Sequence, residues 1–145
     1  MNVILVSGTP GTGKTTVARK IARKNGYKYI DANKLIIKNK LYMAYDNKLR
    51  TRLVDTKILN KFLIIMIKNS KEKGMVIDSH LSHHLPAIYA DLCIITKTDL
   101  KTLNRRLRKR KYSEQKITEN MQAEILNVCL VEALQNKHKI KVIRT

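Results

Sequence analysis

The sequence predicts an α/β fold in which a five-stranded, mostly parallel sheet is flanked by helices. Three observations support this prediction. Short apolar segments alternate with amphipathic ones along the chain, the first apolar segment runs directly into a glycine-rich loop, and no internal repeat or low-complexity linker interrupts the pattern. Alternating strands and helices favour parallel strands joined by helical crossovers. The length of 145 residues is that of one ordinary domain, so we expect a single domain over 1–145.

The elements follow from hydrophobic periodicity and from helix start and stop signals. The first helix illustrates the reasoning, because Val17, Ala18, Ile21 and Ala22 share one face and Gly26 provides a stop. Strands are expected over residues 2–7, 27–30, 75–78, 92–96 and 140–143. Helices are expected over about 15–25, 33–39, 55–73, 99–110 and 113–136. The segment 41–53 is expected to be a polar connection. The stretch that follows the strand 75–78, up to residue 90, is expected to be irregular.

The glycine-rich loop is the clearest chemical signal in the chain. Residues 8–15 read GTPGTGKT, which matches the phosphate-binding pattern G-x-x-x-x-G-K-[ST] at every position. Glycines allow the backbone to curl so that successive N–H groups point into one anion-binding concavity. The loop also ends at a helix N-terminus, where unpaired N–H groups and the helix dipole favour phosphate. The sequence therefore predicts a P-loop that binds a nucleoside triphosphate, with Gly11 and Gly13 in the cradle.

Each polar residue that closes the loop has a predicted task. Lys14 supplies an ammonium group that can bridge the β- and γ-phosphates of ATP. The Thr15 hydroxyl is a suitable Mg²⁺ ligand, and Thr16 is placed to contact the α-phosphate. These tasks require ATP and Mg²⁺ as cofactors but leave the phosphoryl acceptor open.

A P-loop also needs a carboxylate near Mg²⁺, usually at the end of another apolar strand. Asp78 is the acidic residue that ends such a strand, so we expect it in the Mg²⁺ shell. His80 lies two residues further and can face the same crevice, where a neutral imidazole could orient water or an acceptor phosphate. His83 and His84 extend the segment to HLSHH, but no cysteine or carboxylate stands nearby to complete a transition-metal ligand set. We therefore expect no metal site there.

Charge and cysteine content restrict the partners and the compartment. The formal net charge is +19, which attracts polyanions and steers nucleotides, and it also allows contacts with rRNA phosphates. Aromatic residues make up only 5% of the chain, so a base-stacking platform is not expected. The two cysteines, Cys93 and Cys129, stand in apolar contexts and are expected to be buried, reduced thiols. No apolar run approaches a membrane span, and no export segment precedes the P-loop, so we expect a cytoplasmic protein without membrane contact.

The segment 105–111 holds six positive charges in seven residues, between two predicted helices. A solvated helix face explains most such runs. The position is nevertheless suitable for a lid, because a closing arginine can stabilise the charge spread over a phosphoryl group in transfer. Arg106 and Arg110 share a helix face, whereas Arg108 points elsewhere.

Five motifs together resemble one family. They are GTPGTGKTT, the DSH at 78–80, the LY..YD at 41–46, the TD at 98–99 and RKRKYSEQKITENMQAEI at 108–125. From Val3 to about Lys141 the chain resembles the archaeal and eukaryotic adenylate kinases of small-subunit ribosome maturation, whose eukaryotic member is the coilin-interacting nuclear ATPase. The resemblance implies an adenylate kinase fold with a short lid that lacks zinc, phosphoryl transfer from ATP to a nucleoside monophosphate such as AMP, and some ATP hydrolysis. It also implies ribosomal protein uS11 as a partner.

The resemblance assigns roles to particular residues. Gly11, Gly13, Lys14, Thr15 and Thr16 would hold ATP, and Arg110 would be the lid arginine on its phosphates. Asp78 and His80 would match the family's Asp-x-His, which is tied to Mg²⁺ and hydrolysis. The segment 31–54 would form the monophosphate-binding insert, and the segment 109–119 would form the lid.

Two departures from the family concern the acceptor and the adenine. Ile37 stands where the family often has an arginine, so Arg50 or Arg52 would have to supply the charge for the monophosphate. The sequence also ends at Thr145, whereas family members commonly continue with a loop on the adenine and a further helix.

Three alternatives remain open from the sequence: an assembly ATPase with incidental kinase activity, a kinase of a small metabolite, and a ribosome-binding module that holds ATP as a structural ligand.

Overall fold

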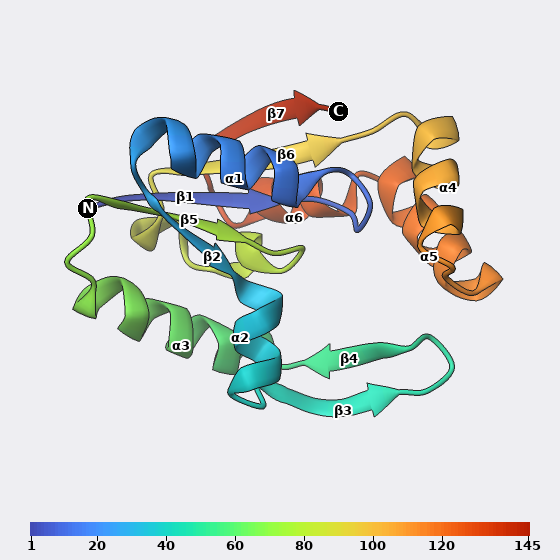
Figure 1. Ribbon diagram of the computed structural model, residues 1–145, viewed down its shortest axis with the longest axis horizontal. Helices are drawn as coiled ribbons and strands as arrows, with labels where there is room; N and C mark the ends of the chain where they lie inside the picture. Colours follow the sequence, from blue (N-terminus) through green and yellow to red (C-terminus); the bar gives the residue numbers. More distant parts are fainter.

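The computed structural model describes the whole printed chain, residues 1–145. Five strands form one parallel sheet in the order β2-β5-β1-β6-β7 (Figure 1). Their bounds are β1 (Asn2–Ser7), β2 (Lys28–Asp31), β5 (Gly74–Asp78), β6 (Leu92–Lys97) and β7 (Ile140–Arg144). The predicted five-stranded parallel sheet is thereby confirmed, with the strand that precedes the P-loop at its centre.

Helices cover both faces of this sheet. They are α1 (Lys14–Asn25), α2 (Ala32–Lys38), α3 (Thr56–Asn69), α4 (Leu100–Lys109), α5 (Glu114–Ile125) and α6 (Val128–Gln135), with two short 3₁₀ helices, η1 (Ser82–His84) and η2 (Ala87–Tyr89). Because successive strand residues point to opposite faces, Ile4 and Val6 pack under α1, whereas Val3 and Leu5 pack with α3 and α6. Both faces of the central strand are therefore buried, as parallel sheets require.

The helix expected over 113–136 is in fact two helices, which is the main correction to the predicted elements. Asn127 adopts φ 52° between α5 and α6, in the left-handed region that asparagine tolerates better than most residues. The break turns α6 back onto the sheet, where Ala133 joins the core. The predicted helix 55–73 also ends earlier, at Asn69.

Gly74 is the first residue of β5. A β-carbon there would lie 2.4 Å from the Tyr27 ring, so the strand passes under the tyrosine only because the residue is glycine.

The segment expected to be a polar connection contains an antiparallel hairpin of β3 (Tyr42–Asp46) and β4 (Thr51–Val54). The Asp46 carboxylate accepts hydrogen bonds from the backbone N–H groups of Lys48 and Leu49, and Arg50 takes φ 50°. These features close the turn, because aspartate readily bonds the backbone two or three residues ahead.

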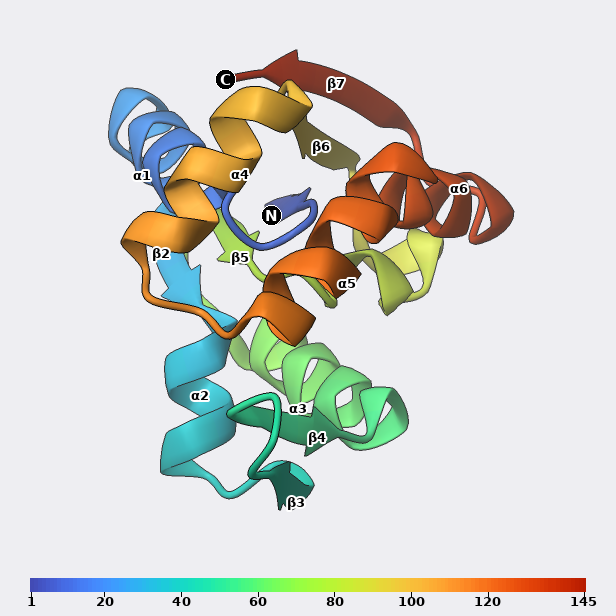
Figure 2. The same ribbon diagram turned by 90° about the vertical axis from the view of Figure 1, so that its right-hand side faces the viewer.

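The carboxyl ends of the strands define one end of the molecule. The β3–β4 hairpin lies at that end, and α4 and α5 lie there too, packed on each other (Figures 1 and 2). The P-loop opens between these two parts, at the point where ligands usually bind in open α/β sheets. The longest helix, α3, has 14 residues, and no helix has the length and apolarity to cross a membrane.

Candidate active site

The P-loop forms an anion cradle between β1 and α1. Gly11 and Gly13 take φ values of 92° and 83°, which side-chain-bearing residues rarely adopt. Gly13 caps α1 without a side-chain hydrogen bond, and no acidic residue lies in the first turn. The first N–H groups of α1 therefore remain available for an anion, and the geometry suits a phosphate group.

Lys14 folds back onto this cradle. Its ammonium group donates hydrogen bonds to the carbonyl oxygens of Gly8 (3.0 Å) and Thr9 (3.1 Å). Desolvation by the surrounding loop lowers the pKa of Lys14 to about 8, although the nearby Asp78 opposes the shift. The charge is thus held at the loop and remains present at neutral pH.

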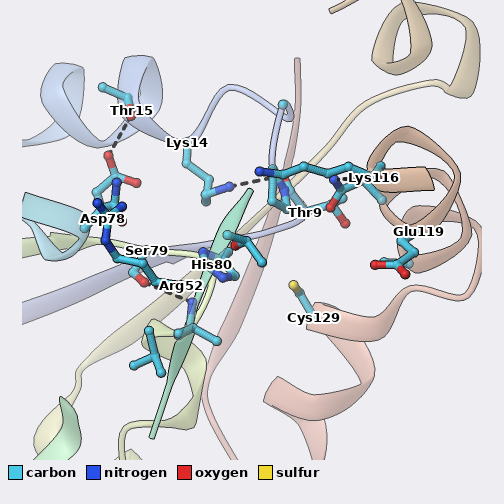
Figure 3. Close-up of a pocket in the computed structure, with 18 of the residues that line it drawn as sticks. Thr9, Lys14, Thr15, Arg52, Asp78, Ser79, His80, Lys116, Glu119 and Cys129 are labelled. Atoms are coloured by element: carbon cyan, nitrogen blue, oxygen red, sulfur yellow. Dashed lines mark hydrogen bonds between the residues drawn. The ribbon is translucent and has the colours of Figure 1, made fainter. Parts of the chain in front are cut away.

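Asp78 ends β5 beside the first turn of α1. Its Oδ2 accepts hydrogen bonds from the Thr15 hydroxyl (2.8 Å) and from the Tyr29 hydroxyl (2.6 Å), and Figure 3 shows Thr15 pointing at this carboxylate. Oδ1 accepts no hydrogen bond from the protein, and Asp78 lines the cavity described below. A carboxylate and a threonine hydroxyl at this distance suit Mg²⁺, which prefers oxygen ligands and keeps several waters.

Tyr29 was not predicted as a site residue. It reaches Asp78 because β2 pairs with β5, and the guanidinium of Arg19 lies 5.0 Å from its ring centre. Burial and the hydrogen bond to Asp78 raise the pKa of Tyr29 to about 12, so the hydroxyl stays protonated and donates a hydrogen bond to the carboxylate. No local motif marks such a tyrosine, because the contact joins neighbouring strands that are 49 residues apart in the chain.

His80 lies on the cavity wall and its side chain is exposed. Protein atoms around the ring desolvate it and, together with the charge of Lys14, lower its pKa below the ordinary value. The imidazole is neutral at pH 7 and can accept or donate a hydrogen bond.

Glu124 ties the P-loop to the sheet and was also missed by the sequence reasoning. This buried carboxylate accepts hydrogen bonds from the Thr9 hydroxyl (3.1 Å) and the Thr98 backbone N–H (2.9 Å), and it pairs with Lys97 at 2.8 Å. A single glutamate within a mostly polar helix gives no chemical signal in the sequence. The structure shows that it links α5 to the P-loop.

One cavity of about 610 Å³ collects the predicted site residues. The ten that line it are Gly11, Gly13, Lys14, Thr15, Thr16, Arg50, Arg52, Asp78, His80 and Arg110. Ile37 does not line it and is exposed on α2. A second cavity of about 570 Å³ lies against the other side of the P-loop, between Thr16, Arg106 and Thr145. The structure thus brings the predicted residues together, and their individual roles stay predictions.

The basic segment divides its arginines among different tasks. Arg106 donates hydrogen bonds to the Gly11 carbonyl (3.3 Å) and the Thr145 hydroxyl (2.9 Å), so it supports the P-loop from behind. Arg108 pairs with Glu114 on the surface. Arg110 lies at the end of α4 and lines both cavities. The predicted lid segment 109–119 therefore presents Arg110 to the P-loop, while Lys116 lines the first cavity.

The two cysteines differ in their surroundings. Cys93 is buried in the core, as expected, and burial raises its pKa to about 12. Cys129 is only half-buried and lines the first cavity, which corrects the expectation of two buried thiols (Figure 3). Both are free thiols.

The strand order, the P-loop that leaves the central strand and the acidic residue at the end of the adjacent strand together define a P-loop kinase fold. A sequence model for a protein family described as "AAA domain" matches residues 4–127. An adenylate kinase isoenzyme 6 homolog from Dictyostelium discoideum is 38% identical over 141 residues, which cover 97% of this chain and 78% of that protein. A Pyrococcus furiosus protein, named provisionally as an adenylate kinase, is 37% identical over 95% of this chain and 72% of its own length.

Solved structures agree on the fold. Shikimate kinase from Bacteroides thetaiotaomicron superimposes with a TM-score of 0.62 and 16% sequence identity, over 99% of this chain and 85% of that one. At this identity the likeness shows the fold alone. The chain belongs to the matched family of P-loop kinases.

Proposed function

We propose that this chain is a nucleoside monophosphate kinase of the adenylate kinase type, which transfers the terminal phosphoryl group of ATP to AMP and, more slowly, to water. One observation carries the proposal: the P-loop and the two arginines of the β3–β4 segment line the same cavity. Arg50 and Arg52 add positive charge to that cavity, away from the P-loop in sequence. Relatives similar along nearly the whole chain are named adenylate kinases, which supports the same substrate class.

The donor end would hold ATP and Mg²⁺. The N–H groups of the P-loop and the Lys14 ammonium bind phosphate oxygens, and Thr15 and Asp78 hold the ion directly or through water. When bound, ATP supplies the phosphoryl group, and Mg²⁺ neutralises charge on its phosphates. Lys14 exchanges its bonds to the Gly8 and Thr9 carbonyls for bonds to phosphate, so its charge needs little rearrangement.

The acceptor end would use the hairpin. Arg52 lies in the cavity with its guanidinium 5.4 Å from the Tyr42 ring centre and 5.8 Å from that of Tyr45. These rings limit the motion of the guanidinium, which favours bidentate binding of a phosphate. Lys116 of α5 donates a hydrogen bond to the Arg50 carbonyl at 3.3 Å, so the lid already touches the hairpin across the cavity. Further closure of the lid over the cavity would exclude water and bring Arg110 to the phosphoryl group in transfer.

The proposal is tested by ADP formation from ATP with each of the four common monophosphates and from ATP alone. We expect AMP to raise ADP formation well above the hydrolysis rate. Arg52→Ala should raise the KM for AMP about 10-fold or more, because a hydrogen bond to a charged group contributes roughly 1.5–3 kcal/mol. The matched control is Lys48→Ala, an exposed cation of the same hairpin that does not line the cavity. If no monophosphate raises ADP formation above hydrolysis, the kinase proposal is wrong.

A second candidate is a cytoplasmic assembly ATPase of the small ribosomal subunit, in which hydrolysis accompanies handling of ribosomal protein uS11. Two observations favour it. The neutral His80 ring is exposed to the solvent of the cavity, where it can orient an attacking water, and the net charge of +19 suits contacts with rRNA phosphates. We expect uS11 to raise ATP turnover in the absence of AMP, and His80→Gln to lower that turnover more than transfer to AMP. Equal losses of both activities would contradict a water-orienting role.

A further inference from the structure

His83 and His84 of η1 meet Glu132 of α6 at the edge of the cavity. One ligand atom from each of the three lies within 4.8 Å of the others. The sequence shows the two histidines but not their carboxylate partner, because Glu132 stands 49 residues beyond His83. The expectation that no carboxylate completes a ligand set near HLSHH is therefore wrong.

His83 is held in a fixed orientation. Its ring is 1% exposed, its Nδ1 lies 2.7 Å from the Ser7 hydroxyl, and its Nε2 lies 3.1 Å from Glu132 Oε1. Its carbonyl accepts hydrogen bonds from Asn136 (2.9 Å) and His138 (3.0 Å), which also fix the backbone. A metal-binding histidine typically has its other ring nitrogen engaged in this way, because that bond sets the tautomer and the ring direction.

His83 already contacts one oxygen of Glu132, whereas His84 approaches the other oxygen without bonding to it. His84 Nε2 lies 3.8 Å from Glu132 Oε2, which is too long for a hydrogen bond. A tetrahedral ion with bonds of about 2.0–2.1 Å separates its ligand atoms by about 3.3 Å. The two observed N–O separations, 3.1 and 3.8 Å, lie on either side of that value. The three side chains therefore stand close enough to share one ion after local side-chain rotation.

We propose that His83, His84 and Glu132 bind one transition-metal ion of the zinc class. Two imidazoles and a carboxylate suit Zn²⁺, Co²⁺ or Ni²⁺ better than Mg²⁺, which prefers oxygen ligands. His84 and Glu132 line the cavity whereas His83 is buried behind them, so a fourth coordination position faces the cavity.

The site is separate from the oxygen pair of Thr15 and Asp78. That pair belongs to the end of β5 and the start of α1, whereas the metal cluster belongs to η1 and α6. The open position would take water or an oxygen of a molecule in the cavity. An ion there would add positive charge to the wall of the cavity formed by α6.

The test is titration of the metal-free full-length protein with Co²⁺, followed by its visible absorption and then by displacement with Zn²⁺. We expect one equivalent of Co²⁺ with the intense bands of a low-coordinate site. His84→Gln and Glu132→Gln should each weaken Co²⁺ binding at least about 10-fold. Glu119→Gln is the matched control, because Glu119 lines the same cavity from α5 and lies outside the cluster. It should bind Co²⁺ like the wild type.

Thermal unfolding provides a second readout. Zn²⁺ should raise the Tm of the wild type and of Glu119→Gln, but not that of the His84→Gln/Glu132→Gln double variant, since only a site in the native state links binding to stability. His84 and Glu132 are 26% and 37% exposed, so these variants retain the fold, which the Tm without metal verifies. The proposal is overturned if the wild type binds no Co²⁺, or if the double variant binds it with the same affinity and spectrum.

Discussion

Replacement of Tyr29 by phenylalanine should weaken catalysis without disturbing the sheet. The change removes the hydroxyl that donates a 2.6 Å hydrogen bond to Asp78 Oδ2, and it leaves the ring that packs beside α1. A hydrogen bond to a charged group contributes about 1.5–3 kcal/mol. Tyr29 is partly exposed, so water can replace part of the bond and the lower end applies. About 1.5 kcal/mol corresponds to roughly a 10-fold loss of kcat/KM.

The assay is steady-state ADP formation at several Mg²⁺ concentrations. Because Tyr29 acts through Asp78, the loss should appear in kcat and in the Mg²⁺ concentration for half-maximal rate, with little change in the KM for AMP. Tyr27→Phe is the control, since the Tyr27 hydroxyl accepts a hydrogen bond from Asn2, far from Asp78. A Tyr29→Phe enzyme with unchanged kcat and Mg²⁺ dependence would refute the positioning role.

Other predictions concern charge and packing. Desolvation lowers the pKa of Lys14 to about 8, so the KM for ATP should rise from pH 7 to pH 9 as the ammonium loses its proton, and Lys14→Arg should abolish this rise because arginine stays charged. Leu59→Ala should cost about 2–5 kcal/mol in urea unfolding, whereas Ile65→Ala, at a residue 60% exposed on the same helix, should cost about 0.5 kcal/mol or less. Glu124→Gln should lower stability by about 3 kcal/mol because it leaves Lys97 without its buried partner, and an unchanged urea midpoint would contradict the importance of that pair.

The features that the sequence predicted well are those coded by neighbouring residues. The P-loop is contiguous, so eight residues specify both the backbone curl and the ammonium that serves it. The parallel sheet follows from apolar runs that alternate with amphipathic ones, and its strands appear within a residue or two of the predicted bounds. Asp78 was found because the end of a buried strand is recognisable locally.

Two local features were predictable in principle but were missed. The hairpin carries an Asp-Asn turn signal at Asp46, between short segments rich in tyrosine, threonine and valine. The break at Asn127 has no glycine or proline to announce it, and a continuous apolar pattern on either side favoured one long helix. In both cases the local signal was weak, and one uninterrupted segment, the connection 41–53 or the helix 113–136, was the simpler prediction.

The sequence by itself therefore determined the fold class and the phosphate-binding end of the cavity. The reason is that the residues of the P-loop are contiguous, so the local sequence alone specifies its backbone curl. Only the tertiary structure decided which side chains support that cradle. Tyr29 reaches Asp78 through the pairing of β2 with β5, Glu124 reaches Thr9 through α5, and Glu132 reaches His83 and His84 through α6. These contacts join residues far apart in the chain, and their distances depend on strand order and helix packing, which no local pattern specifies.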